Sequence, residues 1–136
     1  MNILAIDFGT KNIGLAWCDT GIGVVLPFGV IKNYESRIMN QELSELVHKE
    51  RINKVIVGLP MGLDGQENSN TARVRQFGDQ LKSLIQIPVE YYDERFSSQA
   101  ADAMGGGVSR DEKSAMVILE DYIKTIKQES KKARVL

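Results

Sequence analysis

The stretch NILAIDFG at residues 2–9 decides the fold of this chain. It is a short apolar run closed by a glycine, which is typical of a strand buried in a sheet. A second apolar run follows at 13–18 after one turn, and a third follows at 24–31 after two glycines. Three closely spaced strands joined by tight turns predict an antiparallel meander.

After the meander, the apolar spacing alternates between that of helices and that of strands. Residues 36–50 carry apolar side chains on one helical face, and KVIVGL at 54–59 is a β-branched run typical of a buried strand. The order β-β-β-α-β-α-β-α predicts an α/β fold, with a mixed five-stranded sheet and helices on both faces. The later elements are a helix around 74–85, a strand at 89–92, a short helix at 97–104 and a final helix around 115–126.

Length and composition predict a single domain over residues 1–136, with a basic tail from about 124 to 136. The single cysteine, Cys18, excludes an intramolecular disulfide and fits a reducing cytoplasm. Because no apolar run approaches roughly 18–20 residues and the start lacks a signal-peptide pattern, we expect a cytoplasmic protein without membrane contact. The net charge of −1 does not by itself indicate a nucleic-acid binder.

Acidic residues fall where two strands end and where a helix begins. Asp7 lies near the end of the first strand, Asp93-Glu94 where the last strand ends, and Asp111 at the start of the final helix. Each has an ordinary structural alternative: Asp7 can cap the following turn, Asp93-Glu94 can be a solvated strand end, and Asp111 can stabilise the helix N-terminus. Open α/β sheets carry functional sites beyond the carboxyl ends of their strands, so a shared acidic site is the second interpretation.

A cluster of carboxylates has a specific chemical consequence. The carboxylates repel one another unless a cation neutralises them. Hard oxygen ligands with open coordination positions suit Mg²⁺ or Mn²⁺. Two such ions about 4 Å apart can activate a water and stabilise the leaving oxygen of a phosphodiester. The three acidic positions together therefore predict a metal-dependent nuclease.

Four segments resemble the motifs of a known family. DFGTKNIGLA at 7–16 is similar to the first motif of the YqgF family, also called RuvX-type, a branch of the RNase H-like superfamily. The motifs occur in order from residue 3 to about residue 123, which makes the resemblance specific although each motif alone is weak. The other three are VIVGLPMGLDG at 55–65, DERFS at 93–97, and Asp111 followed by SAMVILEDYI at 114–123.

The resemblance implies an RNase H-like fold and metal-dependent endonuclease chemistry with Mg²⁺ or Mn²⁺. It implies Asp7 and Asp111 as catalytic metal ligands. The third carboxylate comes from Asp93 or Glu94, and the sequence does not decide between them. Two substrates are proposed for the family: the 5′ end of precursor 16S rRNA, and Holliday junctions in DNA recombination and repair. The implied partners are pre-rRNA, with ribosomal precursor particles, or branched DNA.

The same resemblance leaves the assembly and the local packing open. Cutting a junction in concert needs two active sites and hence a homodimer, whereas a monomer is enough for processing single-stranded RNA. Many relatives carry a small hydrophobic pair where this chain has Glu112-Lys113, which puts the packing of the last helix in doubt. Candidate phosphate contacts are Lys11 after the first strand, Arg73 near the second motif and Arg95 in the third. The alternatives are an exposed turn lysine for Lys11, a solvated helix face for Arg73, and pairing with its acidic neighbours for Arg95.

Two other functions compete with the nuclease. DFGT resembles the phosphate loop of actin-type and sugar-kinase-type ATPases, which share the strand meander. Those proteins need two such domains around a nucleotide, and 136 residues provide one. The other alternative is a non-catalytic nucleic-acid-binding or ribosome-assembly factor, which would leave the three acidic positions without a role.

Overall fold

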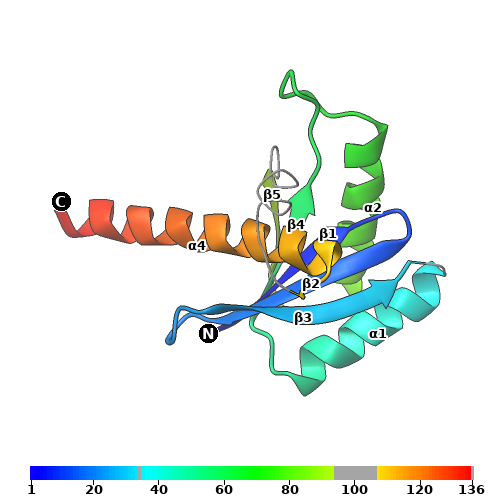
Figure 1. Ribbon diagram of the computed structural model, residues 1–136, viewed down its shortest axis with the longest axis horizontal. Coiled ribbons are helices and arrows are strands. Elements are labelled where there is room, and N and C mark those ends of the chain that lie inside the picture. Colours follow the sequence, from blue (N-terminus) through cyan, green and yellow to red (C-terminus); the bar gives the residue numbers. More distant parts are fainter. Residues whose placement is uncertain (34, 94–106, 136) are drawn as a thin grey trace.

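A computed structural model of the chain describes residues 1–33, 35–93 and 107–135 (Figure 1). The predicted order of strands and helices is confirmed within these ranges, and the short helix expected at 97–104 lies outside them. The elements are β1 (Asn2–Phe8), β2 (Asn12–Asp19), β3 (Val25–Lys32), α1 (Ser36–Lys49), β4 (Lys54–Leu59), α2 (Ser69–Leu84), β5 (Val89–Asp93) and α4 (Arg110–Val135).

The strands form one mixed sheet in the order β3-β2-β1-β4-β5. β1 pairs antiparallel with β2, and β2 pairs antiparallel with β3, which confirms the meander. β4 lies parallel to β1 on its other side, and β5 lies parallel to β4. The opening strand therefore occupies the centre of the sheet, where apolar side chains are buried on both faces.

Helices cover both faces of the sheet, as the sequence predicted. Alternate strand residues pack beneath α1 and α2 on one face and beneath α4 on the other. In β1, Leu4 and Ile6 belong to the first layer, whereas Ile3 and Ala5 belong to the second. Figure 1 shows α4 crossing its face of the sheet and extending well beyond it at its C-terminal end.

Helix α4 is longer than its apolar pattern predicted. It runs from Arg110 to Val135, about 39 Å at 1.5 Å per residue. The segment from 124 onward, expected as a basic tail, continues this helix as far as Val135. Its residues are mostly good helix formers without glycine or proline, so the helix continues after its apolar face ends. Within the described residues, none of the helices combines the length and the apolar character that a membrane crossing needs.

A polar network ties α4 to the parallel half of the sheet. The ammonium of Lys54 in β4 donates to Glu90 Oε1 in β5 and to the hydroxyl of Tyr122 in α4, each at 2.8 Å. Tyr122 in turn donates to Glu90 Oε2 at 2.8 Å. The hydrogen bond with Lys54 lowers the pKa of Glu90, and the same bond raises the pKa of Lys54. This network fixes the middle of α4 at the end of the sheet away from Asp7.

Candidate active site

Asp7 lies at the C-terminal end of the central strand and is half-buried. Strand alternation places its side chain on the same face as Ile3 and Ala5, which pack beneath α4. Its neighbour Phe8 packs on the opposite face, against the layer beneath α1 and α2. The strand that decides the fold therefore presents one carboxylate to the α4 side of the sheet.

Gly14 allows the backbone of Asp111 to approach the strand position opposite Asp7. It lies directly opposite Asp7 in the β1–β2 ladder, where paired Cα atoms are about 4.5–5.5 Å apart. A Cβ added to Gly14 would lie 3.0 Å from the Cα of Asp111 and closer still to its carbonyl. The backbone of the first turn of α4 thus rests on the strand neighbour of Asp7. The structure brings together two of the three predicted acidic positions.

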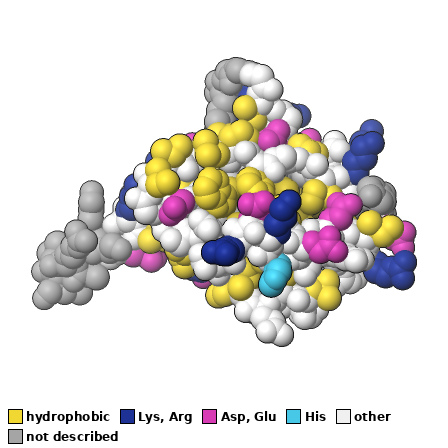
Figure 2. Space-filling model, turned by 90° about the horizontal axis from the view of Figure 1, so that it is seen from below, with side chains coloured by type: hydrophobic (Ala, Val, Ile, Leu, Met, Phe, Trp, Pro, Cys, Tyr) yellow, Lys and Arg dark blue, Asp and Glu magenta, His cyan; other side chains and the backbone are white. Residues whose placement is uncertain are grey.

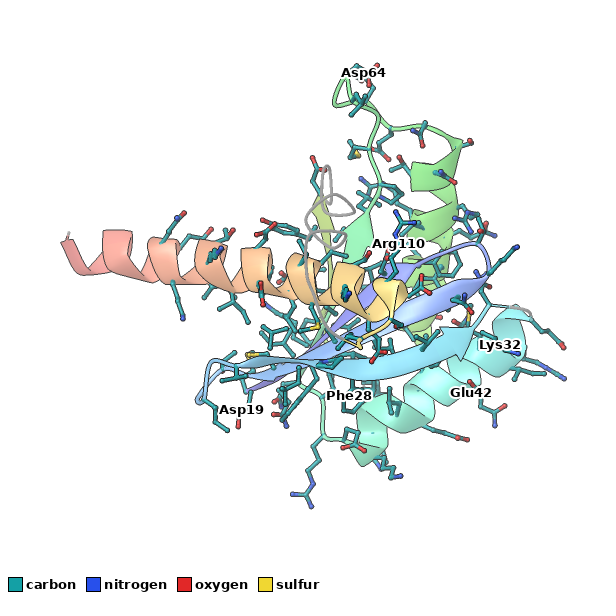
Figure 3. All side chains as sticks on the ribbon, viewed as in Figure 1. Asp19, Phe28, Lys32, Glu42, Asp64 and Arg110 are labelled. Carbon is teal, nitrogen blue, oxygen red and sulfur yellow. The ribbon has the colours of Figure 1, made fainter. Side chains whose placement is uncertain are left out.

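The first turn of α4 is held by the side chain of Glu112. Ser109, the residue before the helix, accepts the Glu112 N–H on its hydroxyl at 3.2 Å and donates that hydroxyl to Glu112 Oε1 at 2.8 Å. The other oxygen, Glu112 Oε2, accepts the backbone N–H of Gly29 in β3 at 2.9 Å. Figure 3 shows Arg110, at the start of the same turn, over the sheet and far from Asp19 at the β2–β3 hairpin. Glu112, which stands where many relatives carry a small hydrophobic residue, therefore contacts the edge strand β3.

The third acidic position is only partly described. Asp93 is the last residue of β5, is exposed, and pairs with Leu59 of β4. Alternation groups Asp93 with Val89 and Tyr91, which pack on the α1–α2 face, opposite to Asp7. Within 1–33, 35–93 and 107–135, no group of three His, Cys, Asp or Glu residues could hold a metal ion. The predicted site residues Glu94 and Arg95 lie outside the described residues.

Lys11 stands on a well-anchored turn that follows β1. The Gly9 N–H donates to the Asn12 carbonyl at 3.0 Å, which closes the turn. Asn33 holds it from outside: its side-chain amide donates to the Gly9 carbonyl at 2.7 Å, and its backbone N–H donates to the Lys11 carbonyl at 2.9 Å. The Lys11 side chain is exposed beside the end of the strand that carries Asp7.

Arg73 lies on the face of the sheet that α1 and α2 cover, opposite to the face that carries Asp7. Its guanidinium carbon stands 4.9 Å from the centre of the Phe8 ring, a cation–π geometry. Phe8 in turn stacks on Phe77 with ring centroids 4.3 Å apart. The nearby Arg75 forms a bidentate ion pair with Glu67, with Nε 2.6 Å from Oε1. These contacts show that Arg73 reaches the C-terminal end of β1 from the α2 side.

Gly14 and Glu112 are the features of the site that sequence reasoning missed. A glycine inside the strand run NIGLA is a signal for close approach of another backbone, so Gly14 was available from the sequence. Glu112 carried no such signal, because its partner Gly29 is 83 residues away. Two aspartates on adjoining backbone segments offer carboxylate oxygens, which are the hard ligands that Mg²⁺ and Mn²⁺ prefer.

Comparison with known proteins identifies the family. The family model described as "RuvX: Holliday junction resolvase" matches residues 1–125. The chain belongs to the RuvX family. A RuvX relative from Bordetella pertussis is 35% identical over 127 residues, covering 93% of this chain and 96% of that protein. A relative from Maridesulfovibrio salexigens is 37% identical over 102 residues, covering 75% of this chain and 76% of that protein. Both carry the name "Putative pre-16S rRNA nuclease", so the predicted family is confirmed.

Solved structures share the RuvX fold at low sequence identity. The chain aligns with Thermus thermophilus RuvC in complex with a Holliday junction substrate at a TM-score of 0.67 and 15% identity, covering 92% of this chain and 95% of that one. It aligns with the fowlpox virus Holliday junction resolvase at a TM-score of 0.59 and 13% identity, covering 92% and 99%. At these identities the likeness shows the fold alone, and it confirms the RNase H-like expectation. The family match favours the nuclease over the ATPase alternative.

Proposed function

We propose that this RuvX protein is a metal-dependent endonuclease that processes the 5′ end of precursor 16S rRNA. The observation that carries the proposal is the approach of Asp111 to Asp7 through Gly14. Two acidic residues from segments about a hundred positions apart meet at the carboxyl end of the central strand, where sheets of this class bind ligands. The name shared by the Bordetella and Maridesulfovibrio relatives supports pre-16S rRNA as the substrate.

Asp7 and Asp111 hold the metal in this proposal. We assign the third ligand role to Glu94 rather than Asp93, because alternation in β5 turns Asp93 toward the face opposite to Asp7. Mg²⁺ or Mn²⁺ suits three carboxylates with open positions, and two ions of the two-metal type would share them. When bound, the ions supply positive charge that stabilises the charge developing on the phosphodiester oxygens.

The remaining side chains position the nucleic acid. Lys11 projects from the turn that Asn33 anchors, so its ammonium can meet a phosphate beside Asp7. Arg73 and Arg95 are the other proposed phosphate contacts, with Arg73 approaching from the α2 side of β1. Figure 2 shows positive and negative side chains interspersed on the face seen from below, so a single-sign phosphate-binding surface is not built there. In this proposal, pre-rRNA or a ribosomal precursor particle approaches the end of the sheet, because Asp7 and the exposed Lys11 lie there.

The family description favours a second candidate, a Holliday junction resolvase. The fold likeness to RuvC and to the fowlpox resolvase is compatible with it. This function requires two copies of the site acting on one junction, hence a homodimer. Processing a single RNA end requires one site, so a monomer suffices for the first candidate.

One cleavage experiment separates these functions. The purified chain is incubated with a precursor 16S rRNA fragment or a four-way DNA junction, with Mg²⁺, with Mn²⁺ or with EDTA. Asp7→Asn and Asp111→Asn remove proposed ligands, and Asp121→Asn is the matched control on an exposed position of α4. Cleavage of the RNA that requires metal and both aspartates supports the proposal. Cleavage of the junction alone establishes the resolvase, and binding without cleavage of either substrate establishes the non-catalytic factor.

A further inference from the structure

The first turn of α4 and the stretch that begins at Ala115 contact the sheet in different ways. From Ala115 onward the helix is held by its apolar face, in which Ala115, Ile118 and Leu119 are almost fully buried against β1, β2 and β4. The first turn, which carries Asp111, precedes this buried face. In that turn, the Glu112 carboxylate accepts a hydrogen bond from the backbone N–H of Gly29 in β3. Asp111 therefore sits in the turn before the buried face, where its own backbone contacts Gly14 and the neighbouring Glu112 is hydrogen-bonded to β3.

The side chain of Glu112 is hydrogen-bonded to two other segments, at Ser109 and at Gly29. Its Oε1 accepts the Ser109 hydroxyl at 2.8 Å, which fixes the residue before the helix. Its Oε2 accepts the Gly29 N–H at 2.9 Å, which fixes the turn to β3. Gly29 has a φ of 108°, a left-handed backbone conformation, beside an irregularity in the β2–β3 pairing at Leu15/Ala16. The carboxylate thus reaches a backbone N–H that a distorted segment of the edge strand presents to it.

We propose that Glu112 is a positioning residue for Asp111: it locks the first turn of α4 to β3 so that Asp111 stays against Gly14, beside Asp7. The inference rests on the proposed function, because it assigns Asp111 to the metal. We assign Glu112 a role through Asp111 rather than as a ligand, because its two oxygens are engaged by Gly29 and Ser109 in holding the turn. Residues that orient metal ligands in this way typically change metal affinity or activity 10- to 100-fold when removed.

The chemistry of the contact separates positioning from ligation. In Glu112→Gln, the amide oxygen can still accept the Gly29 N–H and the amide nitrogen can donate to Ser109, so both links survive without the charge. In Glu112→Ala, both links are lost while the buried face of α4 is unchanged. A positioning role therefore predicts that Gln is close to wild type and Ala is impaired. A ligand role predicts that both variants are impaired.

The test uses the full chain and three measurements. Mn²⁺ binding is followed by calorimetry, cleavage of the precursor 16S rRNA fragment by initial rates, and the exchange rate of the Gly29 amide hydrogen by NMR. Glu112→Ala should weaken Mn²⁺ binding and lower kcat about 10- to 100-fold, with KM for the RNA unchanged and faster exchange at Gly29. Glu112→Gln should retain most of the Mn²⁺ affinity and most of kcat. Glu120→Ala, which removes an exposed acid from the same helix, is the matched control and should match wild type.

Each result decides the inference. If Glu112→Ala binds Mn²⁺ and cleaves like wild type, Glu112 does not position Asp111, and the proposed nuclease function still stands. If Glu112→Gln is as impaired as Glu112→Ala, Glu112 acts through its charge as a ligand, and the positioning role is wrong. If wild type neither binds Mn²⁺ nor cleaves, the proposed function and this inference fail together.

Discussion

Replacing Gly14 with alanine tests how closely the backbone of Asp111 approaches Gly14, because the change adds a single methyl group between them. The added Cβ would fall inside the backbone of Asp111, at 3.0 Å from its Cα and nearer to its carbonyl, where real Cβ atoms are essentially never found. The obstruction is backbone rather than a flexible side chain, so the first turn of α4 must retreat by roughly 1 Å. A displacement of this size at a reacting centre can lower a rate about 100-fold. Overpacking of this kind also costs about 1–3 kcal/mol of stability.

The assay compares cleavage rate with stability in the same samples. Gly14→Ala should lose about 100-fold in kcat on the RNA fragment, while the melting temperature falls by roughly 3–4 °C for each kcal/mol lost. The matched control is Gly107→Ala, because a Cβ at that exposed glycine meets nothing within 4 Å. A folded Gly14→Ala protein that cleaves at the wild-type rate would refute the placement of Asp111 beside Asp7.

Three further predictions follow from contacts elsewhere in the chain. Lys11→Gln should weaken RNA binding and reduce the salt dependence of log K by about 1, as measured by titration at several salt concentrations; an unchanged slope would exclude a phosphate contact. Glu90→Gln should reduce the loss of folding stability that occurs as the pH falls. The lowered pKa of Glu90 means that its pairing with Lys54 stabilises the fold above 4.5, its ordinary value, and that this stability is lost as the pH falls through the lowered pKa. Urea midpoints of both proteins between about pH 3 and 6 should converge at the acid end, and parallel curves would contradict the pairing. Asn68→Ala removes the side chain that accepts the Thr71 N–H at the start of α2, and should cost about 1 kcal/mol in chemical denaturation; no loss would show that this cap is not needed.

Local patterns predicted most of the fold because local physics determines it. The run at 54–59 became β4 with the same bounds, since its β-branched residues fit a strand buried on both faces. Asp111 was placed at a helix start and lies in the first turn of α4. The end of α4 was missed, because the apolar period stops near Ile126 while helix-forming residues continue to Val135.

The parts of the site that sequence could not supply depend on contacts between distant segments. Our preference for Glu94 over Asp93 uses the face on which Val89 and Tyr91 pack, which depends on how β5 lies in the sheet. Predicting the contact of Glu112 with Gly29 requires knowing where α4 lies relative to β3. A pattern of residue types along one chain carries neither piece of information. It could indicate that acidic residues gather beyond the sheet, but not which backbone holds them there.

The central claim is that Asp7 belongs to a metal-dependent nuclease site, and one measurement addresses it directly. The initial rate of Mg²⁺-dependent cleavage of the precursor 16S rRNA fragment is compared between wild type and Asp7→Asn, with circular dichroism showing that both are folded. The account predicts cleavage by wild type that EDTA abolishes, and a loss of at least about 100-fold in Asp7→Asn. Equal cleavage by the two proteins would contradict it.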